Sequence, residues 1–302
     1  MSSPKPPVYI DVSKLPQGDD VWLSSTVTRP STAEVRACSE GGDPEGDITF
    51  LRELGMVVKY GPEVFVAEGQ TLWAMKEYLS GVVPVPEVYG WYREDEALFL
   101  YMELVDGVTL EECWLTIDME ERAAVCAQLG EMVTAWRDLR QDPDDQFLGQ
   151  IGRQPIRDRI SHMEAAPRIL SSVEDFHDNF LFLLVSRRHP PFEGPHPWRA
   201  EFSDDVPIVF THGDLHKSNF IVSREKPIRI KAVIDWEQSG WFPSYWEYCK
   251  TQSTVGFCKS KKLKEAGVDK DGSWKEKFIP LILPSGSEYW EPWFTTRHSL
   301  GY

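Results

Sequence analysis

Two short blocks in the last third of the chain constrain its fold most. The first, Thr211–Asn219, reads THGDLHKSN and follows the apolar segment Val206–Phe210, which has the length of a short strand. The second, Ile234–Glu237, reads IDWE and ends another apolar segment, and a predicted hairpin turn at Arg224–Pro227 separates the two blocks. We therefore expect neighbouring short strands to place the acidic residues of both blocks close together, at one end of these strands.

The residue types in these blocks match the needs of phosphoryl transfer. Asp214 can accept the proton of an attacking hydroxyl group, and Asn219 and Asp235 can hold Mg²⁺ against the phosphates of a nucleotide. Protein kinases use an Asp and an Asn at this spacing, with a later metal-binding Asp. Taken singly, His-Gly-Asp also forms ordinary turns, and Asp235 can cap a helix or form an ion pair. We predict Asp214 as the catalytic base, with His212 bracing the turn by hydrogen bonds.

The segment from His212 to Trp246 resembles the aminoglycoside phosphotransferase family, the small-molecule branch of the protein-kinase-like fold. The blocks HGDLHKSNFIV and IDWEQSGWFPSYWEY are most similar to fungal members, and the resemblance extends over about residues 45–295. It implies an α+β, two-lobed protein-kinase-like fold with a small N-terminal antiparallel-sheet lobe and a larger, mainly helical C-terminal lobe. It also implies ATP or GTP as donor, Mg²⁺ as the metal and a small-molecule hydroxyl substrate as acceptor.

The resemblance divides the chain into three parts. Residues 1–45 are rich in Pro, Gly, Ser and Asp, and we expect a loose N-terminal extension apart from a short helix near Thr32–Ala37. Residues 46–105 would form the nucleotide-binding N-lobe, and residues 106–302 the catalytic and substrate-binding C-lobe. In the C-lobe, we predict a second amphipathic helix over 172–185, with His177 at its surface or capping it. An apolar stripe at helical spacing predicts a core helix that begins near Met119: Val125, Leu129, Met132, Val133, Trp136 and Leu139.

A lysine and an acid in the N-lobe complete the candidate nucleotide site. Lys59 ends the second of two short strands predicted over 48–61. A lysine there can reach the α- and β-phosphates, but it needs an acid to fix its flexible side chain. The resemblance assigns Glu68, at the start of a predicted helix, as this partner. The residues alone also allow Lys59 on the strand surface and Glu68 as a first-turn acid favoured by the helix dipole.

The apolar run that starts at Ala97 and ends in a turn at Gly107 predicts a strand at the boundary between the lobes. The resemblance makes this segment the hinge, where backbone groups of Glu103, Leu104 and Val105 would hydrogen-bond the adenine. An ordinary buried strand has the same sequence pattern, so these three residues rest on the resemblance.

The glycine loop that covers the phosphates in protein kinases has no counterpart in this sequence. Its pattern is G-x-G-x-x-G, whereas the glycine-rich segment upstream of Lys59, Gly41–Asp47, is acidic and would repel phosphate. A catalytically inactive kinase-like binding module is therefore an alternative. A protein Ser/Thr kinase is a weaker alternative, because HGD stands in place of HRD, IDWE in place of DFG, and no A-P-E segment follows Asp235.

Composition excludes several other classes of protein. The formal net charge of −16 disfavours a nucleic-acid partner, since phosphate backbones are bound by clustered Lys and Arg. The same charge can attract a cationic substrate, or it can serve solubility alone. Five cysteines without a C-x-x-C pair argue against structural zinc and a disulfide framework. With no apolar run of membrane-spanning length and no signal-like start, we expect no membrane partner and a cytoplasmic location.

Overall fold

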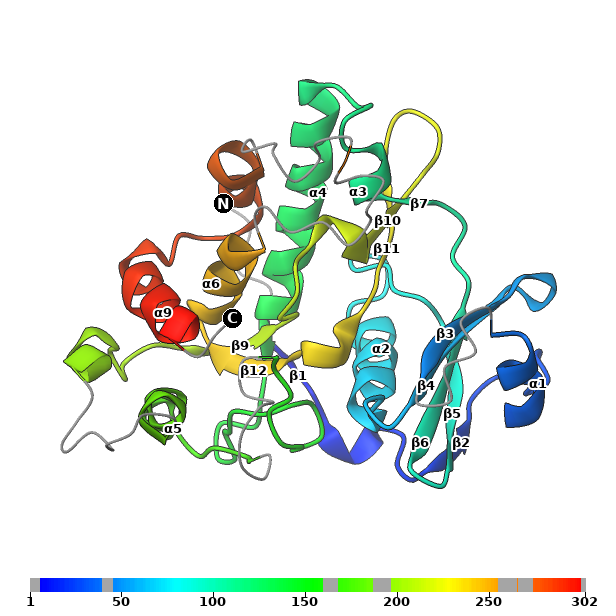
Figure 1. Cartoon of the computed structure of the whole chain (residues 1–302), viewed down its shortest axis with the longest axis horizontal. Coiled ribbons are helices and arrows are strands. Elements are labelled where there is room, and N and C mark those ends of the chain that lie inside the picture. The colour runs from blue at the N-terminus through cyan, green and yellow to red at the C-terminus, as the bar shows by residue number, and fades with distance from the viewer. Residues whose placement is uncertain are drawn as a thin grey trace.

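The sheet of the N-lobe is built around the strand that carries Lys59. The computed structural model describes residues 6–39, 46–159, 168–186, 197–254, 265 and 274–299. Five antiparallel strands form this sheet in the order β2-β5-β6-β4-β3 (Figure 1). Their bounds are Asp20–Trp22 (β2), Asp47–Leu51 (β3), Met56–Gly61 (β4), Val88–Glu94 (β5) and Ala97–Glu103 (β6). The hairpin predicted over 48–61 is confirmed as β3 and β4, joined by the 3₁₀ turn Arg52–Leu54.

Alternation of side chains along β4 assigns the two faces of this sheet. Met56, Val58 and Tyr60 are buried on the face covered by α1 (Thr32–Ala37). Successive strand residues point to opposite faces, so Lys59 points the other way, toward α2 (Val66–Tyr78). Figure 1 shows α2 between the sheet and the C-lobe. This arrangement places the lysine at the boundary between the lobes.

The core helix of the C-lobe is α4, Met119–Arg137. Asp118 caps its first turn in a capping box with Glu121. The predicted apolar stripe is buried from Val125 to Trp136, so the helix expected from the spacing is confirmed. Leu139, the last predicted member, is buried but lies beyond the helix in the strand β8 (Leu139–Arg140). The second predicted helix is also confirmed as α5 (Val173–Ser186).

Two small sheets carry the segments that hold the candidate site residues toward the N-lobe. β9 (Ile208–Thr211) pairs with β12 (Gly240–Pro243), and a three-stranded sheet has the order β11-β10-β7. Its strands are Val108–Thr109 (β7), Phe220–Val222 (β10) and Ile230–Val233 (β11). Phe220 faces Val233 across β10 and β11, which confirms the predicted hairpin. Asp214 follows β9 and Asp235 follows β11, which belong to different sheets, and the backbone N–H of Ile234 joins the two segments by donating to the carbonyl oxygen of Asn219 (2.9 Å).

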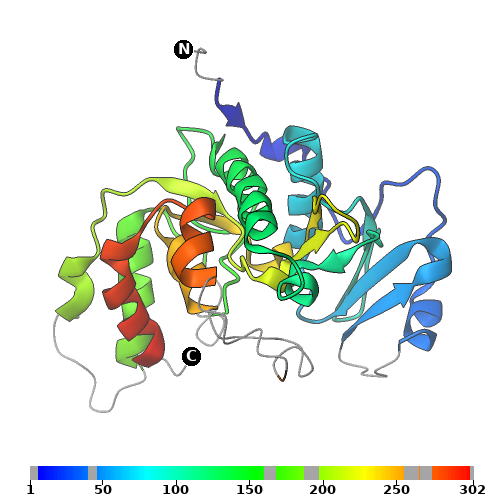
Figure 2. The ribbon, with the colours of Figure 1, turned by 90° about the horizontal axis from the view of Figure 1, so that it is seen from above.

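Two helices, α5 and α9 (Ser287–Ser299), lie at the side of the C-lobe farthest from the N-lobe sheet. Figure 2 shows α5 and α9 side by side at that end of the molecule. The further helical bounds are Val12–Lys14 (η1), Leu110–Cys113 (α3), Pro197–Glu201 (η3), Lys217–Asn219 (η4), Trp236–Gln238 (η5), Trp246–Ser253 (α6), Trp274–Phe278 (a π-helical turn), Ile279–Ile282 (α8) and Ser287–Ser299 (α9). Among the residues that the structure describes, no helix combines the length and apolar character needed to cross a membrane.

The N-terminal extension is more ordered than the sequence predicts. The expected helix is present as α1, but β1 (Val8–Tyr9) also pairs in parallel with β8 (Leu139–Arg140) of the C-lobe. Farther along, β2 joins the edge of the N-lobe sheet. The extension therefore contacts both lobes. Strands of two or three residues are too short to show an alternating pattern, which explains why composition alone suggested a loose segment.

His177 is buried, not at the surface or at a cap as the sequence suggested. Its side chain is 0% exposed on α5. The ring Nδ1 lies 2.7 Å from Asp204 and Nε2 lies 2.9 Å from the hydroxyl group of Tyr245. Partners at both ring nitrogens satisfy the buried imidazole, as buried polar groups require. Because Asp204 and Tyr245 are distant in sequence, local spacing gave no sign of this contact.

Candidate active site

The turn that carries Asp214 depends on a glycine and a histidine. Gly213 has φ +84°, and a Cβ there would lie 2.6 Å from the carbonyl oxygen of Gln238. The Nδ1 of His212 accepts a hydrogen bond from the backbone N–H of Asp214 (3.2 Å), so its Nε2–H donates to the carbonyl oxygen of Ile234 (3.0 Å). Both ring nitrogens are used to join the two acidic blocks. This geometry fits the bracing role predicted for His212.

A buried glutamate that the sequence analysis did not identify holds the same turn. Glu247, on α6, accepts hydrogen bonds from the backbone N–H groups of His212 (2.6 Å) and Gly213 (3.0 Å). Its carboxyl group is fully buried, and burial raises its pKa to about 7, against the opposing effect of these hydrogen bonds and of Arg137. Glu247 therefore fixes the turn that carries Asp214.

Asn219 contacts Asp214 directly. Its Nδ2 donates to the backbone oxygen of Asp214 (2.8 Å) and to Oδ2 of the same residue (3.1 Å). These bonds hold the Asp214 carboxylate in one orientation. The Oδ1 of Asn219 accepts a hydrogen bond from the hydroxyl group of Ser218 (3.1 Å), and as an amide oxygen it is also a ligand type suited to Mg²⁺.

Lys59 lies among three carboxylates from both lobes. Its Nζ is 3.0 Å from Glu68, 3.0 Å from Asp235 and 2.8 Å from Glu237. Burial lowers the pKa of Lys59, but the three acids outweigh burial and hold it well above its ordinary value. Burial, with the charges of Asp235 and Glu237, raises the pKa of Glu68 to about 7, although Lys59 opposes this shift. The structure thus brings together the predicted pair Lys59 and Glu68.

The backbone at Asp235 explains how one turn can present two acids. Asp235 has φ 65°, in the left-handed region that few non-glycine residues occupy, and it precedes the 3₁₀ turn η5. Glu237 lies two residues later in the same turn. Its Oε2 accepts from Lys59, and its Oε1 lies 3.2 Å from Nη2 of Arg159. The sequence analysis quoted Glu237 within the IDWE block but gave it no role.

A cavity of about 270 Å³ lies at the boundary of the two lobes. Its apolar lining includes Ile48, Val57, Leu72 and Met102. All seven residues predicted to contact a nucleotide or a metal also line it: Lys59, Glu68, Glu103, Leu104, Val105, Asn219 and Asp235. Asp214 lies next to the cavity through its hydrogen bond with Asn219. The cavity therefore has an apolar part near the hinge and a charged part near the catalytic turn.

The three residues predicted to form the hinge differ in the hydrogen bonds that their backbones already make. The N–H of Glu103 donates to the carbonyl oxygen of Glu87 (2.8 Å), and the N–H of Leu104 donates to that of Gly55 (2.8 Å). Within the described part of the chain, the N–H of Val105 makes no backbone hydrogen bond. Of these three N–H groups, that of Val105 is therefore the one that can donate to a nucleobase in the cavity.

The donor set fits a divalent cation that binds together with phosphate. Glu68, Asp235 and Glu237 contact Lys59, and Glu237 also contacts Arg159, so acidic groups outnumber the two cations. No group of three or more His, Cys, Asp or Glu side chains among the described residues is arranged to hold a metal alone. Mg²⁺ is commonly bound by one or two protein carboxylates together with nucleotide phosphates, and the carboxylates of Asp235 and its neighbours suit such a site.

Comparison with known proteins identifies the family. A model of the phosphotransferase enzyme family matches residues 68–257, which is more than half of the chain. The chain belongs to this family. No curated protein sequence is significantly similar to this phosphotransferase.

Solved structures of aminoglycoside phosphotransferases share the fold. A thermostable mutant of aminoglycoside phosphotransferase APH(4)-Ia, in ternary complex with ADP and hygromycin B, has a TM-score of 0.52 and 16% identity over 93% of this chain and 84% of that one. A similar ternary complex with AMP-PNP and hygromycin B has a TM-score of 0.51 and 16% identity, over 96% and 87% of the two chains. The predicted two-lobed, protein-kinase-like α+β fold is confirmed.

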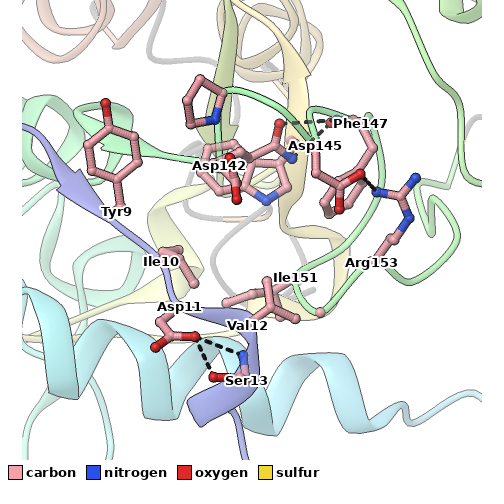
Figure 3. Close-up of a pocket in the computed structure, with 14 residues that line it drawn as sticks. Tyr9, Ile10, Asp11, Val12, Ser13, Asp142, Asp145, Phe147, Ile151 and Arg153 are labelled. Carbon is pink, nitrogen blue, oxygen red and sulfur yellow. Dashed lines mark hydrogen bonds and ion pairs between the residues drawn. The ribbon is translucent and has the colours of Figure 1, made fainter.

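A larger cavity of this phosphotransferase lies away from the predicted site. It has a volume of about 610 Å³ and is enclosed by the N-terminal extension and the loop after β8 (Figure 3). Figure 3 shows Asp11 bonded to Ser13 and Asp145 bonded to Arg153, so two of its acids already have partners. None of the predicted site residues lines it. Size alone therefore does not locate the chemistry, and the smaller cavity is the candidate active site.

One segment considered in the sequence analysis lies largely outside the described residues. The acidic glycine-rich segment 41–47 falls largely outside the described residues, which resume at Gly46. No described strand pairs with the outer edge of β3.

Proposed function

We propose that the protein is a Mg²⁺-dependent small-molecule kinase that transfers the γ-phosphoryl group of ATP to a substrate hydroxyl. The observation that carries this proposal is the convergence of Asp214, Asn219 and Asp235 from the C-lobe with Lys59 from the N-lobe beside one cavity. Membership of the phosphotransferase enzyme family supports the same reaction class. We further propose residues 46–105 as the nucleotide-binding lobe and residues 106–302 as the catalytic lobe, with β2 of the 1–45 extension added to the former sheet.

The nucleotide would bind with its base against the hinge. The apolar lining near Met102 suits a purine ring, and the N–H of Val105 is placed to donate to it. The carbonyl groups of Glu103 and Val105 are further candidate contacts, whereas the N–H of Leu104 is already used by Gly55. Lys59, steadied by Glu68, would hold the α- and β-phosphates. ATP and GTP both present a base edge to such a hinge.

The metal site in this proposal consists of Asn219 and Asp235. Both provide side-chain oxygens at the charged part of the cavity, beside the catalytic turn. Bound there with the nucleotide, Mg²⁺ would neutralise the charge of the phosphate oxygens. Asp235 forms an ion pair with Lys59 (3.0 Å), and the positive charge of the lysine offsets the repulsion between this carboxylate and the neighbouring acids.

Asp214 is the proposed base. Its carboxylate is oriented by Asn219 and carried on a turn that His212 and Glu247 fix. In the transfer step, the acceptor oxygen bonds to the γ-phosphorus and the hydroxyl proton passes to Asp214. The bond from the γ-phosphorus to the bridging oxygen breaks, and ADP leaves with that oxygen. An oriented base within reach of the hydroxyl is the main requirement for this step.

The acceptor belongs to the class of small hydroxyl compounds. The two solved structures above hold hygromycin B, a ligand of those proteins. For this chain, the net charge of −16 favours encounter with a cationic or neutral acceptor over an anionic one. The same charge disfavours nucleic acid as a substrate.

The decisive experiment is isothermal titration of ATP into the pure protein, with Mg²⁺ and then with EDTA, and a repeat with GTP. We expect binding that depends on Mg²⁺, followed by phosphate transfer in a screen of small hydroxyl compounds. If neither nucleotide binds, the chain is a catalytically inactive kinase-like module. Phosphorylation of generic protein substrates would instead favour a protein kinase.

A further inference from the structure

Arg159 is a second cation beside the acids of the candidate site, and neither the catalytic motifs nor the hinge includes it. Its Nη2 lies 3.2 Å from Oε1 of Glu237, while Oε2 of the same carboxylate accepts from Lys59. The guanidinium group and the lysine ammonium group therefore lie on the two oxygens of one carboxylate. Asp214 and Asp235 are also close enough to raise the pKa of Arg159 by their charge, after Glu237 and against the effect of burial.

The backbone of Arg159 is anchored although its side chain is open to solvent. Its N–H donates to Oε1 of Gln238 (3.1 Å), and that oxygen also accepts from Nζ of Lys250 (2.9 Å). Lys250 in turn forms a buried ion pair with Asp158 (2.8 Å), the residue before Arg159. The side chain beyond this anchor is 57% exposed. Because the backbone is fixed, binding a ligand would require ordering of the side chain alone.

The position of this guanidinium group relative to the cavity indicates what it binds. Arg159 is not among the residues that line the nucleotide cavity, whereas Lys59 is. From Lys59 the guanidinium group lies on the far side of Glu237, and it is within electrostatic range of the proposed base. A nucleotide whose α- and β-phosphates contact Lys59 would extend its γ-phosphate toward Asp214, the proposed catalytic base. The guanidinium group is therefore on the side where the γ-phosphoryl group would lie.

The N-lobe provides little other positive charge for that group. The segment 39–47 contains no Lys or Arg, and the glycine pattern of a phosphate-covering loop is absent from it. Lys59 is the cation that lines the cavity, and three carboxylates already contact it. Guanidinium groups bind phosphoryl oxygens through two parallel hydrogen bonds, which a lysine cannot reproduce.

We propose that Arg159 contacts the γ-phosphoryl oxygens of the bound nucleotide and stabilises their negative charge during transfer. This role rests on the proposed phosphotransfer function. Arg159 would exchange its contact with Glu237 for the phosphoryl group, and Glu237 would keep its bond to Lys59. The proton still passes to Asp214 and ADP still leaves with the bridging oxygen, so Arg159 adds charge stabilisation and no further covalent step.

The test compares ADP with AMP-PNP, two probes that differ at the γ-phosphoryl position. Their Mg²⁺-dependent dissociation constants are measured by titration for the unaltered protein, Arg159→Gln and Arg159→Lys. We expect Arg159→Gln to weaken AMP-PNP binding about tenfold or more and to leave ADP binding within about twofold, as loss of a charge-assisted hydrogen bond predicts. Arg159→Lys should lie between these values.

Arg153→Gln is the matched control. Arg153 lies in the same loop, is about half exposed and pairs with Asp145 at the remote cavity. This variant should bind both probes as the unaltered protein does. An equal loss for ADP and AMP-PNP in Arg159→Gln, or no loss for either, overturns the role of Arg159 while the nucleotide site stands. Failure of the unaltered protein to bind ADP overturns the proposed function itself and this role with it.

Discussion

At the scale of single residues, Asp214 is the sharpest test of the reaction. Replacing Asp214 with Asn keeps the size of the side chain but removes the proton acceptor. We expect turnover to fall by about 10²–10⁴, the usual contribution of general base catalysis, with nucleotide affinity nearly unchanged. Initial rates with a confirmed acceptor and titration of ATP measure the two effects separately. Full turnover in this variant would remove Asp214 from the mechanism.

Glu247 gives a prediction about pH. Its pKa is about 7 in the folded protein and near 4.5 when exposed, so folding favours the protonated form. A raised pKa contributes stability that is present below about pH 4.5 and is lost as the pH rises through about 7. The free energy of unfolding should therefore fall between pH 5 and 8, by roughly 3 kcal/mol from this group. Glu247→Gln cannot ionise and should show a smaller decline.

Urea unfolding of both proteins across this pH range checks the prediction. Parallel curves of unfolding free energy against pH would show that Glu247 does not titrate in the window. Other groups contribute equally to both curves, so the difference between them isolates Glu247. Glu247 also holds the turn that carries Asp214. The activity of Glu247→Gln should therefore also decline less with rising pH than that of the unaltered protein.

At the scale of elements, the turn between β9 and η4 depends on Gly213. Both Gly213 (φ +84°) and Gly81 (φ +80°) have left-handed backbones, but only the added Cβ at Gly213 meets backbone, 2.6 Å from the Gln238 oxygen. Gly81→Ala should cost about 1–2 kcal/mol from backbone strain alone. Gly213→Ala should cost more and should also reduce activity. If Gly213→Ala and Gly81→Ala lost equal amounts of unfolding free energy, the turn at Gly213 would have accommodated the Cβ by a small shift of the backbone.

The elements that the sequence predicted are those with a clear periodic pattern or a turn. The stripe along α4, the β3–β4 hairpin and the strand pair β10–β11 all have one. β1 and β2 have two and three residues, too few to show alternation, and they were missed. Within the site, Asp214 was predicted from a motif and Lys59 from its place at the end of a predicted strand. Glu247 stands inside the second quoted block but was given no role, and Arg159 lies outside both blocks, because the contacts of both are with residues distant in sequence.

At the scale of the whole molecule, the extension links the lobes independently of the hinge. The carbonyl oxygen of Pro16 accepts from Nε2 of Gln70 on α2, and Gln70 in turn accepts from Gln154 of the C-lobe (2.7 Å each). Leu15 is buried beside this chain of contacts, near Gly152. The residues that line the nucleotide cavity come from both lobes. We therefore predict that their separation depends on this link as well as on residues 103–107.

Removing the apolar contact of the extension tests this link. Leu15 is 2% exposed, whereas Leu23 in the same extension is 39% exposed, so Leu23→Ala is the matched control. Leu15→Ala should lower the free energy of unfolding by about 2–4 kcal/mol, and Leu23→Ala by under about 1 kcal/mol. If the extension also sets the spacing of the lobes, ATP affinity should fall in Leu15→Ala alone, under conditions where both variants remain folded. Loss of stability with unchanged affinity would assign the extension to stability and leave the hinge in sole control of the site.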